Sequence, residues 1–385
     1  MAVNNGGGSV RSRGPIALSA ALALVVVAAL VLLLLQRGGP AASSPPSAGP
    51  TTAVTPVPVT EPPPTEAVAE KCKGQKVSFE LSFIPNVQHA GFLVASKRGY
   101  YTDEGLDVEI KGAGPGVDVT QDVADGTVSL GQVDYVDIAE ARLAGVPIKA
   151  VAQTYKKPFF FWYSNKDSGI PDVAAWKGHT LGAIQVGDYP ERDAMMLAAG
   201  LDPKKDITVV QQDFGTDDFI AGKVDIGEGV VFYHPAFLVG VNHKAWPDDF
   251  IVYRPEDNGA DFASQTVAAS EDFLAKDPAA VKCFLRASIR GWAATFADPK
   301  AAVTDTMTFI PEGAIPEPHQ QAAINDVLPI VGSGASDKTL LQPTPDKYKA
   351  TIDQLKTLGY LTEDVDVAKT YDSSFYDSMG PVPAP

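Results

Sequence analysis

The sequence predicts an α/β protein of two lobes, preceded by one transmembrane helix and an extended tether. Three observations carry this prediction: an apolar run near the N-terminus, a proline-rich stretch after it, and a long body in which strand-like and helix-like segments alternate. The chain has 385 residues, of which 45% are hydrophobic, which suffices for more than one core. Its net charge of −16 argues against nucleic acid as a partner, because no excess of cations is present to neutralise phosphates.

The first element is the apolar run at residues 16–35, which carries no charge. Twenty helical residues span about 30 Å, the thickness of the hydrocarbon core of a bilayer. Arg11 and Arg13 favour a cytoplasmic N-terminus at residues 1–15. We therefore predict an uncleaved signal anchor, a single pass through the cell membrane and an extracytoplasmic body. A signal peptide cleaved within "GGPAASS" is the alternative, and no cysteine before Cys72 offers a site for lipid attachment.

The second element, residues 36–71, is rich in Pro, Ala, Ser and Thr. Such a composition cannot bury a core, so we expect a disordered, partly polyproline II tether. The body starts at Cys72, and the second cysteine of the chain is Cys283. An exported chain with two cysteines suggests a disulfide, and two unrelated buried thiols are the alternative.

The body begins with alternating strands and helices. Strands are expected at 77–84, 106–110, 128–133 and 147–155, with helices at 91–101, 117–126 and 136–146. A second set follows the aromatic strand 158–165. It comprises strands at 179–184, 207–212 and 224–230, and helices near 190–199, before 222 and across 235–241. Alternation of this kind is typical of parallel sheets.

After the strand-like stretch 264–270 the chain is nearly all helix, with an apolar stripe between the Asp-Pro pairs of 277–299. We therefore assign residues 72–157 and 264–385 to lobe 1, and residues 158–263 to an inserted lobe 2. A ligand is expected in the cleft between the lobes, at the carboxyl ends of the strands.

Catalytic motifs are missing from the sequence. It contains no G-x-S-x-G, H-E-x-x-H or Walker loop, and "KGAGPGVDV" lacks the third glycine of a dinucleotide fingerprint. The five histidines show no i,i+3 or i,i+4 pair of the kind that binds metals. We therefore expect no enzymatic activity, no cofactor and no metal.

Acidic and aromatic residues recur where strands end. The acids are Asp134, Asp188 and Glu228, and the aromatic residues near them are Tyr135, Tyr189 and Tyr233. A helix N-cap explains a single Asp after a strand equally well. His89 and His234 also follow strand ends, where a capping or surface role is the alternative. Together these residues offer stacking faces and hydrogen-bond acceptors, which a flat nitrogen heterocycle requires.

The stretch "FIPNVQHAGFLVASKRGYYTDEGLDVEI" resembles the start of the substrate-binding proteins of ABC importers in the thiamine-pyrimidine-precursor and nitrate/sulfonate/taurine superfamily. "VADGTVSLGQVDYVDIAEARLAGVPIKAVAQTY", "KDSGIPDVAAWKGHTLGA", "AGKVDIGEG" and "ASIRGWAATFADP" continue the resemblance, which covers about residues 76–377. It implies a type II periplasmic-binding fold that closes on a small molecule, with ABC permease and ATPase subunits as separate chains. It also implies that Asn86 and His89 contact the ligand.

The resemblance leaves the ligand open. Pyrimidine precursors such as hydroxymethylpyrimidine or formylaminopyrimidine, and riboflavin, are the ligands we expect. The segment "FYHPA" stands where relatives carry an Asn-Glu pair, so the heterocycle itself is not specified. Three alternatives remain: an anion-binding protein for nitrate or sulfonates, an enzyme similar to the fungal hydroxymethylpyrimidine phosphate synthase, and a membrane-tethered sensor. The enzyme carries a cysteine-rich motif that two cysteines cannot form.

Overall fold

The computed structural model describes residues 72–385, except Lys73, Pro115, residues 185–186, Asp188, Asp213 and residues 243–244. The predicted anchor and tether, and the candidate Asp188, lie outside the described residues. Within the part of the chain that is described, no helix combines the length and the apolar character needed to cross a membrane.

The first sheet of the described residues has five strands, in the order β2-β1-β3-β10-β4. Their bounds are β1 Gln75–Leu81, β2 Leu106–Gly112, β3 Leu130–Val133, β4 Ile148–Gln153 and β10 Thr266–Ser270. β1 runs parallel to β2 and β3, whereas β10 is antiparallel to β3 and β4. The sheet is therefore mixed, because β10 enters it from the opposite side.

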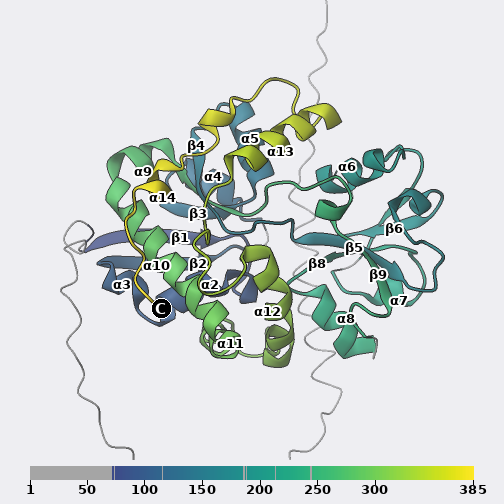
Figure 1. Ribbon diagram of the computed structural model, residues 1–385, viewed down its shortest axis with the longest axis horizontal. Helices are drawn as coiled ribbons and strands as arrows, with labels where there is room; N and C mark the ends of the chain where they lie inside the picture. Colours follow the sequence, from purple (N-terminus) through teal and green to yellow (C-terminus); the bar gives the residue numbers. More distant parts are fainter. Residues whose placement is uncertain are drawn as a thin grey trace, which may run out of the picture.

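The strands between β4 and β10 build a second group (Figure 1). They are β5 Phe160–Asn165, β6 Thr180–Ala183, β7 Thr208–Gln211, β8 Gly227–Val230 and β9 Phe250–Tyr253. β5 is antiparallel to β8 and β9, β6 is parallel to β7, and a bridge between Leu181 and Ile226 joins the two pieces. Each group thus holds one antiparallel strand, β10 in the first and β5 in the second. In both cases it is the strand that directly follows the connection from the other group. The prediction of parallel strands was wrong for β5 and β10 for this reason, and it missed β9.

Helices cover both groups of strands. In the first half they are α2 Ala90–Lys97, α3 Tyr100–Asp103, α4 Val119–Ala124, α5 Tyr135–Leu143, α6 Pro190–Ala198, α7 Asp217–Ile220 and α8 His234–Asn242. In the second half they are α9 Glu271–Lys276, α10 Pro278–Ala297, α11 Pro299–Met307, α12 Glu317–Val331, α13 Pro345–Leu358 and α14 Ser374–Asp377. Short 3-10 turns stand at Val87–His89, Val173–Trp176, Pro255–Asp257 and Val367–Lys369. The helix expected at 91–101 is divided because Gly99 takes a left-handed φ of 76° between α2 and α3.

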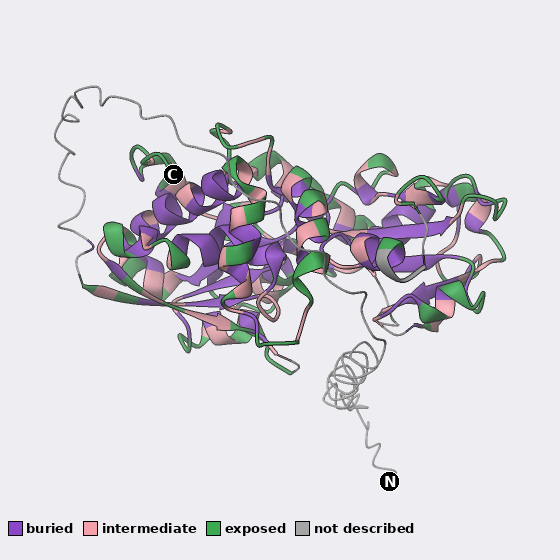
Figure 2. Cartoon of the chain, turned by 90° about the horizontal axis from the view of Figure 1, so that it is seen from below, coloured by how far each residue is buried: buried purple, intermediate pink, exposed green. Residues whose placement is uncertain are grey.

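The long helix α10 lies against α2 (Figure 1), and both are mostly buried. Figure 2 shows buried residues throughout the strands and on the helices that cover them. The two backbones approach closely at Gly291 and Gly91: a Cβ built on Gly291 would lie 2.0 Å from the carbonyl oxygen of Gly91. The ring of Trp292 covers Gly91 in the same way. This crossing needs glycine because any side chain there would overlap backbone atoms.

Cys72 and Cys283 form a disulfide, with their Cα atoms 6.7 Å apart. The structure therefore has the bridge that the sequence suggested. It fastens the first described residue of the body to α10, within the core around Phe284.

The two segments that connect the strand groups run side by side. The amides of Thr154 and Tyr155 donate to the carbonyl oxygen of Gln265, at 2.8 and 3.1 Å. Lys347 of α13 donates from Nζ to the carbonyl oxygen of Lys156, at 2.6 Å, and also contacts Asp261. We call the group around β1–β4 and β10 lobe 1, and the group around β5–β9 lobe 2. The predicted boundaries at 157/158 and 263/264 remain an interpretation of these connections.

Candidate functional site

The polar triplet after β1 has a local structural role. Asn86 Oδ1 accepts from the amide of Gln88, at 2.7 Å, and thereby caps the turn Val87–His89. Asn86 Nδ2 donates to the carbonyl oxygen of Ile84 and to Gln88 Oε1, at 3.0 and 3.2 Å. Since these bonds use its amide, Asn86 shapes the loop that carries His89.

His89 is fully buried, and its Nδ1 lies 2.6 Å from Gln132 Oε1 on β3. An amide oxygen accepts, so Nδ1 carries the hydrogen and Nε2 presents a lone pair. Burial lowers the pKa of His89 to about 3, which keeps the ring neutral. Nε2 has no hydrogen-bond partner among the described residues.

Asp134 and Tyr135 follow β3 but differ in role. Asp134 caps α5 by accepting from the amide of Val136, at 3.1 Å, and its other oxygen lies 3.4 Å from Ser264 Oγ and from Gln265 Nε2. Tyr135 is buried in the core, with its ring centroid 4.2 Å from that of Tyr348 and its hydroxyl 2.5 Å from Thr370 Oγ1. The stacking face expected of Tyr135 is thus occupied by the protein itself.

Glu228 stands on β8 of lobe 2 and is buried. Its Oε1 accepts from the amide of Ile184, at 3.2 Å, while Oε2 has no partner within the described part of the chain. Gln212 fixes the strand at this point, because its Nε2 donates to the carbonyl oxygen of Glu228, at 2.8 Å. Glu228 therefore holds its carboxylate away from solvent, opposite Trp162 of β5, whose indole N–H lowers the pKa of Glu228.

Tyr233 and His234 come at the start of α8. His234 Nδ1 accepts from the amide of Val230, at 3.0 Å. A backbone amide can only donate, so the ring hydrogen of neutral His234 is on Nε2, which has no partner among the residues described. Burial lowers the pKa of His234 to about 3. His89 and His234 are thus neutral rings of opposite polarity, one offering a lone pair and the other an N–H.

Four carboxylates influence one another across the two lobes. Burial, and after it the nearby charge of Glu191, raise the pKa of Asp134 to about 7. Burial likewise raises the pKa of Glu191 to about 7, with repulsion from Asp137 and Glu228. The pKa of Glu228 is also raised to about 7 by burial, against the effect of Arg192. Asp134 and Asp137 belong to lobe 1, and Glu191 and Glu228 to lobe 2, so acidic groups of the two lobes face each other.

Asp137 differs from the other three because it is exposed to solvent. Its pKa is nevertheless raised to about 8, by the surrounding protein and by repulsion from Asp134 and Glu140.

Aromatic rings adjoin the acidic group. The ring centroid of half-buried Tyr189 lies 5.0 Å from that of Phe160 and 6.0 Å from that of Trp162, both edge to face. Burial and then the charges of Glu191 and Glu228 raise the pKa of Tyr189 well above its usual value, so its hydroxyl stays protonated. In contrast to Tyr135, Tyr189 keeps part of its surface accessible.

Asp137 and Glu191 were not among the site residues predicted from the sequence. Both belong to a pattern that occurs once in each lobe, "DYVD" at 134–137 and "DYPE" at 188–191. In both patterns the second acid stands three residues after an Asp. This repetition is the signal that would have found them.

The acidic group makes stability depend on pH. Carboxylates with raised pKa bind protons in the folded state that they do not bind when unfolded, so the free energy of unfolding falls as pH rises from about 4 and levels off above the raised pKa values of about 7. We expect a loss on the order of 2 kcal/mol between about pH 6.5 and pH 8.5, a window in which unfolded histidines are largely neutral. Urea unfolding at a series of pH values measures this slope. Glu191→Gln should reduce it and raise stability at pH 8; an unchanged slope would contradict the arrangement.

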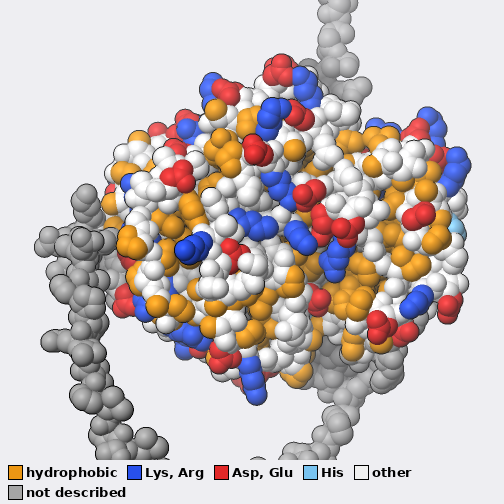
Figure 3. Space-filling view, in the orientation of Figure 1, with side chains coloured by type: hydrophobic (Ala, Val, Ile, Leu, Met, Phe, Trp, Pro, Cys, Tyr) orange, Lys and Arg blue, Asp and Glu red, His pale blue; other side chains and the backbone are white. Residues whose placement is uncertain are grey.

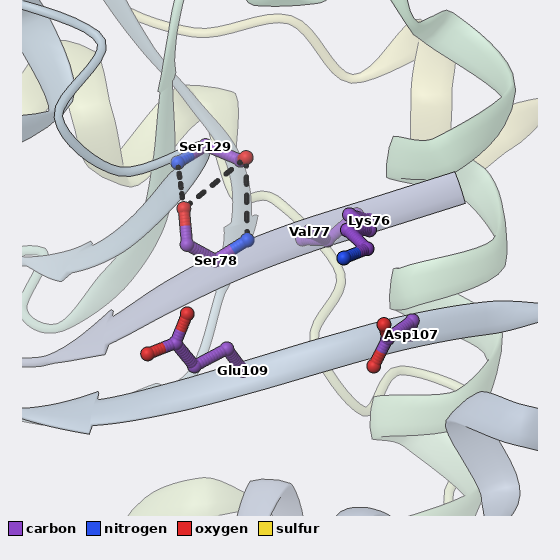
Figure 4. Close-up of a pocket in the computed structure, with 6 residues that line it drawn as sticks. All are labelled: Lys76, Val77, Ser78, Asp107, Glu109 and Ser129. Atoms are coloured by element: carbon purple, nitrogen blue, oxygen red, sulfur yellow. Dashed lines mark hydrogen bonds between the residues drawn. The ribbon is translucent and has the colours of Figure 1, made fainter. Parts of the chain in front are cut away.

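A pocket of about 420 Å³ lies elsewhere, on β1 and β2 (Figure 4). It is lined by Lys76, Val77, Ser78, Asp107, Glu109 and Ser129. Ser78 and Ser129 bond to each other, with the amide of Ser129 donating to Ser78 Oγ at 2.9 Å. None of the predicted ligand residues lines this pocket, so we do not place the ligand there.

Charged side chains of both signs lie on the surface of the described residues (Figure 3). On the face shown in Figure 3, basic and acidic side chains alternate without a continuous basic area. Among the described residues, no group of three or more His, Cys, Asp or Glu is arranged to hold a metal ion.

Comparison with known proteins agrees with this architecture. The family described as "NMT1/THI5 like" matches residues 86–302, more than half of the chain. The riboflavin-binding protein RibY of Chloroflexus aurantiacus is 28% identical over 84% of this chain and 93% of its own length. The 4-amino-5-hydroxymethyl-2-methylpyrimidine phosphate synthase THI13 of Saccharomyces cerevisiae is 26% identical over 62% of this chain and 72% of its own.

Solved structures show the same fold. The periplasmic aliphatic sulphonate binding protein SsuA of Escherichia coli superposes with a TM-score of 0.60 at 16% identity, over 78% of this chain and 92% of that one. The periplasmic nitrate-binding protein NrtA of Synechocystis gives a TM-score of 0.56 at 12% identity, over 79% and 88%. The mixed α/β fold is thus that of periplasmic binding proteins, and the chain belongs to the NMT1/THI5-like family.

Proposed function

We propose that this protein is the extracytoplasmic substrate-binding component of an ABC importer, and that it captures a small aromatic heterocycle between its lobes. The ligand is a thiamine pyrimidine precursor, such as hydroxymethylpyrimidine or formylaminopyrimidine, or riboflavin. It acts without catalysis, and its permease and ATPase subunits are separate chains. The predicted anchor at residues 16–35 would hold it at the membrane.

One observation carries the proposal: buried polar atoms without partners among the described residues belong to the strand ends and loops of both lobes. They are His89 Nε2, Gln132 Nε2, Gln265 Oε1, Glu228 Oε2 and His234 Nε2. Burying a polar group without a hydrogen bond costs on the order of 1–3 kcal/mol. A heterocycle with ring nitrogens and an exocyclic amine or carbonyl offers both donors and acceptors to such a set. Half-buried Tyr189 provides an aromatic neighbour.

The acidic group favours this ligand class over anions. Burial raises the pKa of Asp134, Asp137, Glu191 and Glu228, and repulsion from acidic neighbours adds to it for the first three. A nitrate or sulfonate would add a further negative charge and carries no donor for Glu228 Oε2. The fold is shared with SsuA and NrtA, but this chemistry does not favour their ligands.

The remaining alternatives are weaker. An activity like that of the fungal synthases would require the cysteine-rich motif, whereas both cysteines of this chain are joined in a disulfide. A tethered sensor would bind the same ligand without a permease, so co-purification with permease subunits separates a sensor from an importer component.

Isothermal titration with hydroxymethylpyrimidine, formylaminopyrimidine, thiamine and riboflavin tests the proposal. We expect one of them to bind, and Glu228→Gln to weaken that binding by about tenfold to 100-fold, because a charge-assisted bond contributes on the order of 1.5–3 kcal/mol. Glu109→Gln is the matched control, since Glu109 lines the separate pocket of lobe 1. Binding of taurine or nitrate in place of every heterocycle would instead establish the anion alternative.

A further inference from the structure

A chain of hydrogen bonds connects the two histidine-bearing loops through α12. At one end, the amide of Val87 donates to Gln320 Oε1, at 2.8 Å. Next, Gln320 Nε2 lies 3.2 Å from His319 Nδ1. At the other end, His319 Nε2 lies 3.1 Å from the carbonyl oxygen of Tyr233. Val87 is two residues from His89, and Tyr233 precedes His234.

The direction of every bond in this chain is fixed by chemistry. A backbone amide only donates, so Gln320 must turn its oxygen to Val87 and its NH2 group to His319. His319 Nδ1 must then accept, which leaves the ring hydrogen on Nε2, where it donates to Tyr233. A single state of the His319 ring, neutral with the hydrogen on Nε2, satisfies all three bonds.

The surroundings hold both side chains in place. They stand in the first turn of α12, where the amides of His319 and Gln320 both donate to the carbonyl oxygen of Pro316. Gln320 is buried, and the ring centroid of His319 lies 4.9 Å from that of Tyr233. Partial burial lowers the pKa of His319, which favours the neutral ring. Figure 1 shows α12 between α11 of lobe 1 and α8 of lobe 2.

Aromatic rings make a second connection between the lobes here. Phe83, in the loop after β1, lies 6.3 Å from Phe214 of lobe 2, ring centroid to ring centroid. Phe214 in turn lies 4.8 Å from Tyr233 and 5.4 Å from His234. The loop after β1 and the start of α8 therefore adjoin, with α12 bonded to both.

We propose that His319 and Gln320 are positioning residues that hold the loop of His89 and the loop of His234 at a fixed separation, so that the two rings engage one ligand together. They act through the backbone of Val87 and Tyr233 and do not touch the ligand. The proposal deepens the proposed function, because it takes His89 and His234 as ligand contacts. The proposal gives α12 a role in ligand affinity. No sequence pattern predicted this role for His319 or Gln320.

The variant Gln320→Leu tests the proposal in the full chain. It removes the acceptor of the Val87 amide and the donor to His319, and we expect binding of the heterocycle found by titration to weaken about tenfold. Gln321→Leu is the matched control on the same helix, because Gln321 Nε2 bonds to the exposed carbonyl oxygen of Lys300, at 3.3 Å, and not to either histidine-bearing loop as the structure describes them. We expect its affinity to stay within about twofold of the wild type. His319→Gln can still donate to the carbonyl oxygen of Tyr233 through its side-chain amide. This variant should therefore retain more affinity than His319→Leu.

Two further readouts need no ligand. In Gln320→Leu, hydrogen exchange of the peptide that contains Val87 should become faster, with little change in the Gln321→Leu protein. The 15N shifts of His319 should report a neutral ring with the hydrogen on Nε2. The proposal is overturned if His319 carries its hydrogen on Nδ1, or if Gln320→Leu matches Gln321→Leu in both exchange and affinity. If the wild type binds no heterocycle, the proposed function fails, and exchange and ring state still decide whether the connection exists.

Discussion

Replacing both cysteines, Cys72→Ser with Cys283→Ser, is expected to lower the free energy of unfolding by roughly 5 kcal/mol. The bridge joins residues 211 positions apart, so in the chain-entropy model it removes much of the freedom of the unfolded chain. The loss is comparable to the whole stability of many domains, so the variant is expected to unfold at a much lower denaturant concentration. Guanidinium unfolding followed by the fluorescence of buried Trp162, Trp176 and Trp292 measures it.

The double variant avoids leaving a single free thiol, which could pair between molecules. Wild-type protein unfolded with a reducing agent present serves as the control and should match the variant. At a temperature where the variant stays folded, ligand affinity should be unchanged, because Cys72 and Cys283 are core residues and not among the candidate ligand contacts. Two free thiols in denatured, unreduced wild-type protein would show that the bridge does not form.

Gly291→Ala is expected to destabilise the protein by about 3 kcal/mol, although alanine forms helices better than glycine by about 1 kcal/mol. The added Cβ would lie 2.0 Å from the carbonyl oxygen of Gly91 and 2.8 Å from the Cβ of Ala95. Neither of these atoms can rotate away, so α10 and α2 must move apart and lose packing along their length. A loss of stability would show that packing outweighs helix propensity, and a gain would show the reverse. Thermal unfolding at neutral pH measures the change.

Gly114→Ala is the matched control, because a Cβ built there meets nothing within 4 Å. We expect its stability to stay within about 0.5 kcal/mol of the wild type. A stabilised Gly291→Ala protein would mean that α2 and α10 do not cross as closely as the structure has them.

Much of the fold follows from local pattern. The apolar stripe between two Asp-Pro pairs located α10 almost to the residue, since the Pro of each pair suits the first turn of a helix. The strand–helix alternation of residues 77–155 located β1 to β4 for the same kind of reason. The short β9 escaped notice because "FIVY", at 250–253, is four residues long and lies between polar turns.

The sequence predicted which types of residue form the candidate site better than it predicted how they are arranged. Acids after strands were recognised, but the sequence could not show that Tyr135 turns into the core while Tyr189 keeps an accessible face. That difference arises from Tyr348 on α13, more than two hundred residues along the chain, which stacks on Tyr135. Asn86 was expected at the ligand and in the structure caps the turn before His89.

The sequence by itself determined the types of most elements, the family and the acidic character of the strand ends. Each depends on neighbours in the chain or on composition. The tertiary structure decided which strands run in reverse, which ring nitrogens of His89 and His234 remain unpaired, and that Asp134 and Glu191 influence each other across two lobes. These properties depend on contacts between residues far apart in sequence, and a hydrogen atom on a histidine is placed only by the group that the ring meets.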